Sequence, residues 1–364
     1  MDIARGNRSL VFLSNTSGQI EPDSPRVSII IPARNEEKNI RQALHSVLNQ
    51  NYPNLEFVVL NDRSTDNTGA ILGKMAAEDN RLRVETISEL PQGWLGKNYA
   101  LYLGAKLAAG ELLLFMDADV VMHPDTVARA VNYCQAQRLD HLAILPDVVA
   151  PTLPLRLFCS AFGIFFSMYI RPAKAKDSRF PNFIGIGAFN LVRKQAYEFS
   201  GTHEAIAMRP DDDVKLGKLL KSAGFRQEMV LGMGLLSVEW YPSLRQLIDG
   251  LMKNAFAGIN YSLALSVCSG IAVLLLNVWP FAALFVTAGI TRILYLLTVL
   301  VMVWFVSDCN HFFGLPRWYT AAHPFSALLF VYIIWKSTAL TLWTRGINWR
   351  GTHYPLALLK ANRV

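Results

Sequence analysis

Residues 110–119 of the chain read GELLLFMDAD, and this stretch decides the fold class. The apolar run 112–116 has the length of a strand, and Asp117-Ala118-Asp119 follows it directly. A continuous apolar run is typical of a strand buried on both faces of a parallel sheet. Ligands of such sheets bind beyond the carboxyl ends of the strands. We therefore expect Asp117 and Asp119 to lie beside a binding site.

Strand-like and helical patterns alternate on both sides of this stretch. The alternation predicts a mostly parallel sheet covered by helices on both faces, an α/β architecture. The expected strands are residues 27–31, 55–60, 82–86, 112–116 and 141–145, and the expected helices are 37–50, 68–78 and 125–137.

Two further polar loops follow predicted strands. The first contains Pro32, Ala33, Arg34 and Glu36 and leads into a helix. The alternative is that its acids only stabilise that helix N-terminus. The second loop, residues 61–68, has side chains suited to binding a base and ribose, but it is also rich in turn and cap formers.

Asp117 and Asp119 indicate a site for a divalent cation. Magnesium and manganese prefer oxygen ligands and bind through one or two carboxylates together with phosphate oxygens. Such a cation would stabilise a departing diphosphate. The alternative is an ordinary turn with Asp119 as a helix cap.

A second acidic cluster, Asp211-Asp212-Asp213, precedes an amphipathic helical pattern. Repulsion among three carboxylates raises the proton affinity of at least one, which suits a base that accepts a hydroxyl proton. The alternative is N-terminal capping. Lys97 lies at the start of another predicted helix and could contact phosphate together with the N-terminus of that helix, or could be a solvated surface lysine.

The second half of the chain is predicted to be membrane-embedded. Residues 263–306 are 44 residues with a single charge, Arg292, about twice the length needed to cross a hydrocarbon core of roughly 30 Å. Two spans are expected there, with a turn near Trp279 and Pro280, and a third span at residues 321–343. The alternative is a large buried helical core.

Charge and cysteine content agree with this interpretation. The net charge is +7, and the basic tail 344–364 favours an anionic surface; no basic stripe with interleaved aromatics points to nucleic acid. The four cysteines form no CxxC pair, which is compatible with a reducing cytosol. The polar tail 1–25 resembles neither a signal peptide nor an anchor, so the next region is expected in the cytoplasm.

The expected domain order follows from these patterns. A catalytic domain spans residues 26–240, and within it the aromatic segment 155–171 is expected to lie in the membrane interface, with a core helix as the alternative. An interfacial amphipathic helix, 241–261, then precedes a membrane region of about three spans, 262–343.

Five motifs occur in order along the chain: VSIIIPARNEE (27–37), LNDRSTDNT (60–68), GWLGKNYALYLGAKLAAGELLLFMDAD (93–119), IGIGAFNLVRKQAYE (184–198) and RPDDDVKLGKLLKSAG (209–224). Together they resemble family 2 glycosyltransferases of the GT-A fold, the fold of nucleotide-diphospho-sugar transferases. The membrane segments, GWLGK and the terminal WRGTHY are most similar to ceramide glucosyltransferases and to hopanoid or carotenoid glycosyltransferases.

The resemblance implies roles for the candidate residues. The loop 32–36 and Asp62 would hold the nucleotide, Lys97 would approach the diphosphate, and Asp117 would lie on the nucleotide side of a metal bound directly by Asp119. Asp213 matches the family's base. Asp212 stands where glutamate is usual and therefore competes for that role.

The chain departs from the family at the QxxRW element, which is absent. Arg245 and Lys253 are the candidates for the missing positive charge near the diphosphate, and the alternative is that both face lipid headgroups.

The predicted function is inverting transfer of a sugar from a nucleotide-diphosphate sugar, with a UDP-sugar favoured, to a lipid acceptor. Mg²⁺ or Mn²⁺ is the expected cofactor. The protein is expected in the cell's inner membrane with its catalytic domain in the cytoplasm. Two alternatives are transfer to a polyprenyl phosphate and a non-catalytic membrane scaffold.

Overall fold

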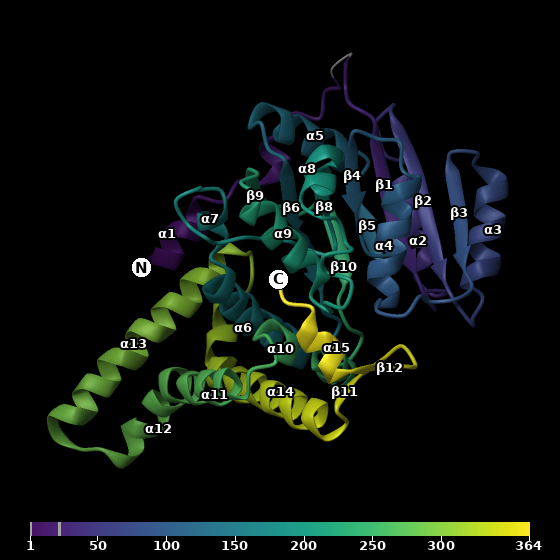
Figure 1. Ribbon diagram of the computed structural model, residues 1–364. Coiled ribbons are helices and arrows are strands. Elements are labelled where there is room, and N and C mark those ends of the chain that lie inside the picture. Colours follow the sequence, from purple (N-terminus) through teal and green to yellow (C-terminus); the bar gives the residue numbers. More distant parts are fainter. Residues whose placement is uncertain (1, 21–22) are drawn as a thin grey trace. The chain divides into compact units, whose positions relative to one another are not determined.

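The computed structural model describes residues 2–20 and 23–364, and Figure 1 shows its elements in chain order. The chain forms two compact units, each assembled from separate segments. The first unit comprises Ala150–Arg171, Trp240–Ala361 and the segment ending at Ser9; the second comprises Leu10–Val149, Pro172–Glu239 and Asn362–Val364. This division differs from the expected linear domains, because 150–171 belongs with the apolar helices. The predicted tail 1–25 includes residues 1, 21 and 22, which lie outside the described residues.

The second unit is built on a seven-stranded sheet in the order β3-β2-β1-β4-β8-β6-β9. Neighbours β3, β2, β1 and β4 are parallel, β8 runs antiparallel to β4 and β6, and β6 is parallel to β9. The predicted mostly parallel α/β architecture is confirmed. The strands are β1 (Val27–Ala33), β2 (Leu55–Asp62), β3 (Leu82–Ile87), β4 (Leu112–Phe115), β6 (His141–Leu145), β8 (Asn190–Arg193) and β9 (Gln227–Leu231).

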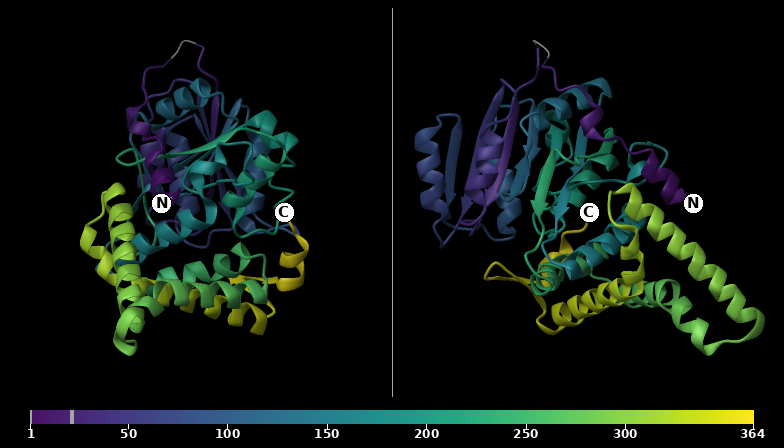
Figure 2. Two further views of the ribbon diagram at one scale, coloured as in Figure 1. Left: turned by 90° about the vertical axis from the view of Figure 1, so that its left-hand side faces the viewer. Right: turned by 180° about the vertical axis from the view of Figure 1, so that it is seen from behind.

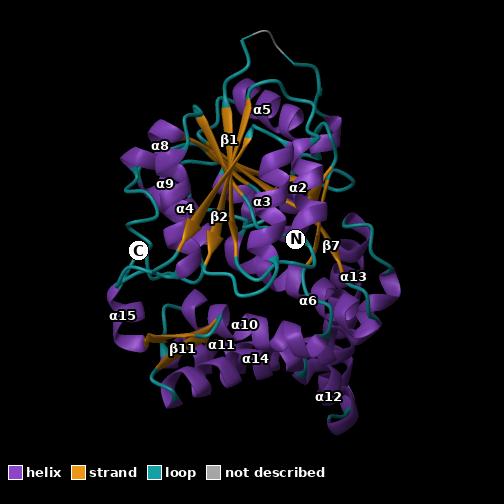
Figure 3. Cartoon of the chain, turned by 90° about the vertical axis from the view of Figure 1, so that its right-hand side faces the viewer, coloured by secondary structure: helices purple, strands orange, loops and turns teal. Residues whose placement is uncertain are grey.

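Helices cover both faces of this sheet (Figure 3). They are α2 (Ile40–Leu48), α3 (Thr68–Glu78), α4 (Gly96–Leu107), α5 (Thr126–Ala136), α7 (Pro172–Ala175), α8 (Lys194–Phe199) and α9 (Asp212–Ser222). A smaller sheet has the order β5-β10-β7, formed by β5 (Val120–Met122), β10 (Leu236–Glu239) and β7 (Asp147–Val149).

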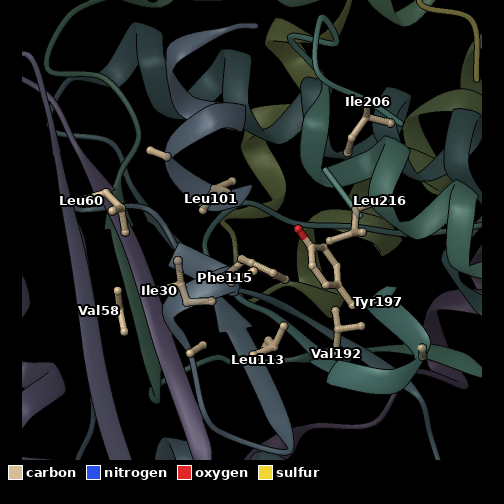
Figure 4. Close-up of a cluster of buried hydrophobic side chains, with 14 of the residues drawn as sticks. Ile30, Val58, Leu60, Leu101, Leu113, Phe115, Val192, Tyr197, Ile206 and Leu216 are labelled. Carbon is tan, nitrogen blue, oxygen red and sulfur yellow. The ribbon is translucent and has the colours of Figure 1, made fainter. Parts of the chain in front are cut away.

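The inner strands β1 and β4 of this sheet are buried on both faces, unlike the edge strand β3. In β1 every residue except Pro32 is buried. On one face, Ile30, Leu60 and Phe115 pack against Leu101 of α4 and Leu216 of α9 (Figure 4). Burying each such side chain contributes about 1.5–3 kcal/mol. This packing fixes the starts of α4 and α9 near the carboxyl ends of β1 and β4.

The first unit is mainly helical. Figure 2 shows its longest helix, α13, joined through the short α12 to α11. The helices are α1 (Asp2–Arg8), α6 (Leu153–Ile170), α10 (Leu244–Gly258), α11 (Leu263–Asn277), α12 (Trp279–Val286), α13 (Gly289–Phe312), α14 (His323–Trp343) and α15 (Leu356–Ala361), with a hairpin of β11 (Gly346–Trp349) and β12 (Thr352–Pro355). A 3₁₀ helix, Arg317–Ala322, leads into α14, and another, Leu13–Asn15, lies in the second unit.

Three helical segments are long and apolar enough to cross a membrane: Leu153–Ala175, Gly289–Phe312 and Arg317–Trp343. A fourth would exist if α10 and α11, which are bent by 115°, formed one broken span. The stretch 263–306 does not form the expected pair of spanning helices. Its first helix, α11, has 15 residues and is about 22 Å long at 1.5 Å per residue, which is shorter than a hydrocarbon core of roughly 30 Å.

The turn before α13 also lies later than expected. It falls at residues 287–288, so Arg292 lies near the start of α13 and not in the middle of a span. Its Nε donates to the carbonyl oxygen of Thr287 at 2.7 Å. The guanidinium of Arg292 therefore provides a hydrogen-bond donor for a carbonyl oxygen at the end of α12.

Segment 155–171 forms α6, a helix packed within the first unit. Leu155 and Phe158 are buried against Leu247 and Leu251 of α10 and Ile333 of α14. Since α6 also has spanning length and hydropathy, its location in the membrane interface stays a prediction.

Candidate active site

Three elements distant in sequence bring a lysine and two aspartates together in the second unit. Lys97 is the second residue of α4, Asp117 follows β4, and Asp212 begins α9. Lys97 Nζ lies 2.8 Å from Asp117 Oδ1 and 3.5 Å from Asp212 Oδ2. Burial by itself would lower the pKa of Lys97, but the carboxylates of Asp117 and Asp212 outweigh it and the pKa is raised. The lysine therefore stays cationic.

Asp213 lies in the same pocket as this group. Its Oδ2 accepts a hydrogen bond from the main-chain N–H of Gly187 at 2.8 Å, and its Oδ1 accepts one from the N–H of Val214. Burial raises the pKa of Asp213, and the charge of Asp117 adds to this effect, although Lys97 opposes it. A half-buried carboxylate with a raised pKa and a fixed orientation is suited to accept a proton.

Glycines allow the main chain to approach these carboxylates closely. A Cβ on Gly187 would lie 2.7 Å from Asp117 Oδ2 and 3.4 Å from Asp213 Oδ2, and one on Gly185 would lie 1.8 Å from the carbonyl oxygen of Asp213. The N–H of Asp117 also donates to the carbonyl oxygen of Gly187 at 3.0 Å. Segment 184–189 therefore lies against both acidic loops. A side chain at Gly185 would clash with the main chain, and one at Gly187 would require Asp117 or the main chain to shift.

Asp119 is the candidate for direct metal binding. Its Oδ1 is buried and has no hydrogen-bond partner within the described chain. Burial raises the pKa of Asp119 to about 7, with additional repulsion from Asp117 and Glu36. A buried carboxylate oxygen that lacks a donor and is surrounded by acids suits a cation. Within residues 2–20 and 23–364, no three His, Cys, Asp or Glu side chains form a metal-binding group, so a metal would need further ligands from substrate or water.

The two predicted nucleotide loops interlock. The N–H of Glu36 donates to Thr68 Oγ1 at 2.8 Å, and Asn35 Oδ1 accepts from the N–H of Thr65 at 2.8 Å. The N–H of Glu37 likewise bonds Asp66. These bonds explain why the predicted helix 37–50 begins only at Ile40, because the second loop holds residues that would otherwise form the first helical turn.

Asp62 is buried at the end of β2. Its carboxylate accepts from Arg63 Nε at 2.7 Å and lies 3.7 Å from a guanidinium nitrogen of Arg34. A Cβ on Gly96, the first residue of α4, would lie 2.3 Å from Asp62 Oδ2. The loop that carries Arg34, the end of β2 with Asp62 and the start of α4 with Lys97 are thus packed side by side.

Asn98 and Arg209 lie within the quoted motifs but were not predicted as site residues. Asn98 is fully buried, and its Nδ2 donates to the carbonyl oxygens of Ile206 at 2.7 Å and Arg209 at 2.9 Å. Arg209 is buried and forms a two-point ion pair with Asp211. Asp211 is thereby committed to structure, which leaves Asp212 and Asp213 for chemistry.

The pocket between these elements is lined by Lys97, Leu101, Phe115, Met116, Asp117, Gly187, Asn190, His203, Asp212, Asp213 and Leu216. His203 is buried, and its Nδ1 lies 2.8 Å from the hydroxyl of Tyr197. Burial lowers the pKa of His203 to about 3, with a further contribution from Lys97. The imidazole is therefore neutral, and His203 was not among the predicted site residues.

Arg245 and Lys253 lie on α10, in the first unit, whereas all the other candidate residues lie in the second. Lys253 Nζ lies 4.0 Å from the centre of the Trp349 ring, a cation–π contact within the first unit. Contact of Arg245 and Lys253 with a diphosphate therefore stays a prediction.

A sheet of this order with acidic residues beyond its carboxyl ends defines the GT-A class of folds. A solved structure supports the assignment: a mannosyltransferase, PcManGT from Pyrobaculum calidifontis, in complex with GDP-Man and Mn²⁺, has a TM-score of 0.56 and 18% identity, with 94% of each chain covered. Residues 28–200 match the family described as glycosyl transferase family 2. The chain therefore carries a glycosyltransferase family 2 domain, as the motif order predicted.

Curated relatives agree with the family. The chain is 27% identical over 237 residues to a 4,4'-diaponeurosporenoate glycosyltransferase of Staphylococcus haemolyticus and 26% identical over 234 residues to the protein of the same name from Staphylococcus aureus strain MRSA252. These matches cover 64% of this chain and 62% and 61% of the relatives. The similarity thus spans less than two thirds of their length.

Proposed function

We propose that the protein is a membrane glycosyltransferase that moves a sugar from a nucleotide-diphosphate sugar to the hydroxyl of a lipid acceptor. The observation that carries the proposal is the meeting of Lys97, Asp117 and Asp213 around Gly187, within a family 2 domain. Displacement of a diphosphate requires a base and positive charge near the leaving group. Asp213 can act as the base, Lys97 supplies a positive charge, and Asp117 with Asp119 can hold a metal at the same edge of the sheet.

The proposed reaction is one in-line displacement. Asp213 takes the proton of the acceptor hydroxyl, the oxygen forms a bond to the anomeric carbon, and the bond from that carbon to the diphosphate oxygen breaks. One displacement inverts the anomeric centre. Asp213 is favoured over Asp212 as the base, because Asp212 forms an ion pair with Lys97 at 3.5 Å, whereas burial raises the pKa of Asp213 despite the charge of Lys97.

Asp119, together with Asp117, would hold Mg²⁺ or Mn²⁺, which when bound would neutralise charge on the departing diphosphate. The partnerless Oδ1 of Asp119 supports this assignment. Lys97 adds a fixed positive charge close by. PcManGT has a similar fold and its structure contains GDP-Man and Mn²⁺, so a metal and a nucleotide sugar are compatible with this architecture.

The loop 32–36 and Asp62 would hold the nucleotide, with a UDP-sugar as the favoured donor. The acceptor is proposed to be a lipid because three segments have spanning length and the relatives are named for a carotenoid acceptor. We place the protein in the cell's inner membrane with the second unit on the cytoplasmic side.

The test uses membranes that contain the full chain and a panel of radiolabelled UDP- and GDP-sugars. Lipids are extracted and separated after incubation. Label is expected in one lipid species from one donor, and this label should disappear with Asp213→Asn. Failure of every donor to label a lipid would contradict the proposal, and labelling that survives Asp213→Asn would favour a polyprenyl phosphate acceptor, which already carries its charge.

A further inference from the structure

The turn at residues 203–209 connects α8 to the acidic start of α9. Its internal bonds, such as Arg209 N–H to the carbonyl oxygen of Ile206 at 2.9 Å, form tight turns and not a regular helix. Its shape therefore depends on neighbouring segments. Since Asp212 follows Arg209 by three residues, the shape of the turn sets where α9 begins.

One neighbour is the start of α4. The N–H of Leu95 donates to the carbonyl oxygen of Ala207 at 2.9 Å, and Asn98 bonds the carbonyl oxygens of Ile206 and Arg209. This side of the turn is thereby tied to the helix that carries Lys97.

The other neighbour is the segment 362–364, which belongs to the second unit. Asn362 Oδ1 accepts a hydrogen bond from the main-chain N–H of Met208 at 3.0 Å. Asn362 Nδ2 donates to the carbonyl oxygen of Ala205 at 2.9 Å. One side-chain amide thus satisfies a main-chain donor and a main-chain acceptor of the turn, which requires both groups of an amide.

The rest of this segment is also anchored. Lys218 Nζ, on α9, donates to the main-chain oxygen of Val364 at 2.7 Å. The side chain of Val364 packs against the core cluster that contains Leu216 and Leu220. Arg363, between the two anchored residues, is exposed. The contacts of 362–364 therefore join the turn before α9 to α9 itself.

We infer that Asn362 is a positioning residue for Asp212 and Asp213: its amide sets the 203–209 turn and thereby the place of the proposed base relative to Lys97. This inference rests on the proposed function. Asn362 does not line the pocket that holds Lys97, Asp117 and Asp213, so its loss is expected to change the geometry of the reacting groups and not the nucleotide loops.

The test compares Asn362→Ala with Arg363→Ala in the full-length protein. The Asn362→Ala variant is expected to lower the kcat of sugar transfer roughly ten- to a hundredfold, since small displacements of a catalytic group have effects of this size. The KM for the donor and the Kd of the nucleotide should stay unchanged. Arg363→Ala should match the wild type in all three.

Hydrogen exchange provides a readout that does not depend on turnover. The Met208 amide should exchange faster in Asn362→Ala and normally in Arg363→Ala. Unchanged exchange of Met208, or unchanged kcat despite faster exchange, would overturn the inference. If the wild type transferred no sugar from any donor, the proposed function would fail, whereas the exchange data would still decide whether Asn362 holds the turn.

Discussion

Lys97 Nζ lies 2.8 Å from Asp117 Oδ1, so an ion pair joins the first turn of α4 to the end of β4. The pair holds a positive charge against the acidic loops that would face a diphosphate.

Replacing Lys97 with Met keeps the length of the side chain and removes its charge. Transfer is expected to fall about 10²-fold, since one fixed electrostatic group is lost. The free energy of unfolding should also fall by about 1–3 kcal/mol, because Asp117 and Asp212 lose a partner. Steady-state kinetics and thermal unfolding measure both effects. Lys74→Met, at an exposed position of α3, is the control and should change neither.

Asp213→Asn removes the proposed base while preserving the shape of the side chain. We expect kcat to fall by about 10²–10⁴-fold, the usual contribution of a general base. Nucleotide binding, measured by calorimetry, should be nearly unchanged. If Asp212→Asn causes the larger loss of kcat, the two residues exchange roles.

Gly187→Ala would place a methyl group 2.7 Å from Asp117 Oδ2. We expect a marked loss of transfer, because Asp117 or the main chain must shift. Gly73→Ala, at an exposed position of α3 with no atom within 4 Å of the added Cβ, is the matched control. It should leave transfer unchanged and stabilise the protein by about 0.4–1 kcal/mol. Equal transfer rates in the two variants would argue against close packing at Gly187.

A chelator of divalent cations is expected to abolish transfer, and added Mn²⁺ or Mg²⁺ should restore it. Binding of Mn²⁺ can be followed directly by electron paramagnetic resonance. Asp119→Asn should weaken this binding, because the buried oxygen loses its charge, whereas Glu78→Gln at the exposed end of α3 should not. Full activity in the presence of the chelator would exclude the proposed metal.

His141 predicts a pH dependence of stability. It is fully buried beside Asn190, its Nε2 lying 3.0 Å from the side-chain oxygen of that residue, and burial lowers its pKa from 6.5 to about 4. Between these values the unfolded chain binds a proton that the folded protein does not. His141 therefore makes stability fall as pH drops from about 6.5 to about 4, by up to about 1.4 kcal/mol per pH unit.

The measurement compares wild type with His141→Gln across this pH range. The difference in melting temperature isolates His141, since all other titrating groups are common to both proteins. The stability of the wild type relative to the variant should decline toward low pH. A difference that is constant with pH would contradict the prediction.

Much of the fold could be predicted from the sequence because the buried strands carry a local signal. Helix 68–78 and strand 141–145 were predicted with the observed bounds. The short strands β5 and β7 were not predicted, since three residues are too few to show a periodic pattern.

The candidate site was predictable only where its residues form motifs. Asp117 and Lys97 were predicted separately, but their ion pair depends on how α4 packs on the sheet. The roles of Gly187 and Asn98 depend on contacts with segments about 26 and 110 residues away, and no periodicity of the chain encodes such contacts. His203 lies outside the five sequence motifs, so its place in the pocket was not predicted.

The position of β8 constrains the order in which this protein can assemble on the ribosome. β8 fills the place between β4 and β6, yet it is synthesised after α6. Until then β4 has an unpaired edge, and Asp212 and Asp213, which come later still, have not been made. The apolar helix α6 is therefore synthesised before the acidic cluster can form, so the chain can engage a membrane during translation before it has a complete active site.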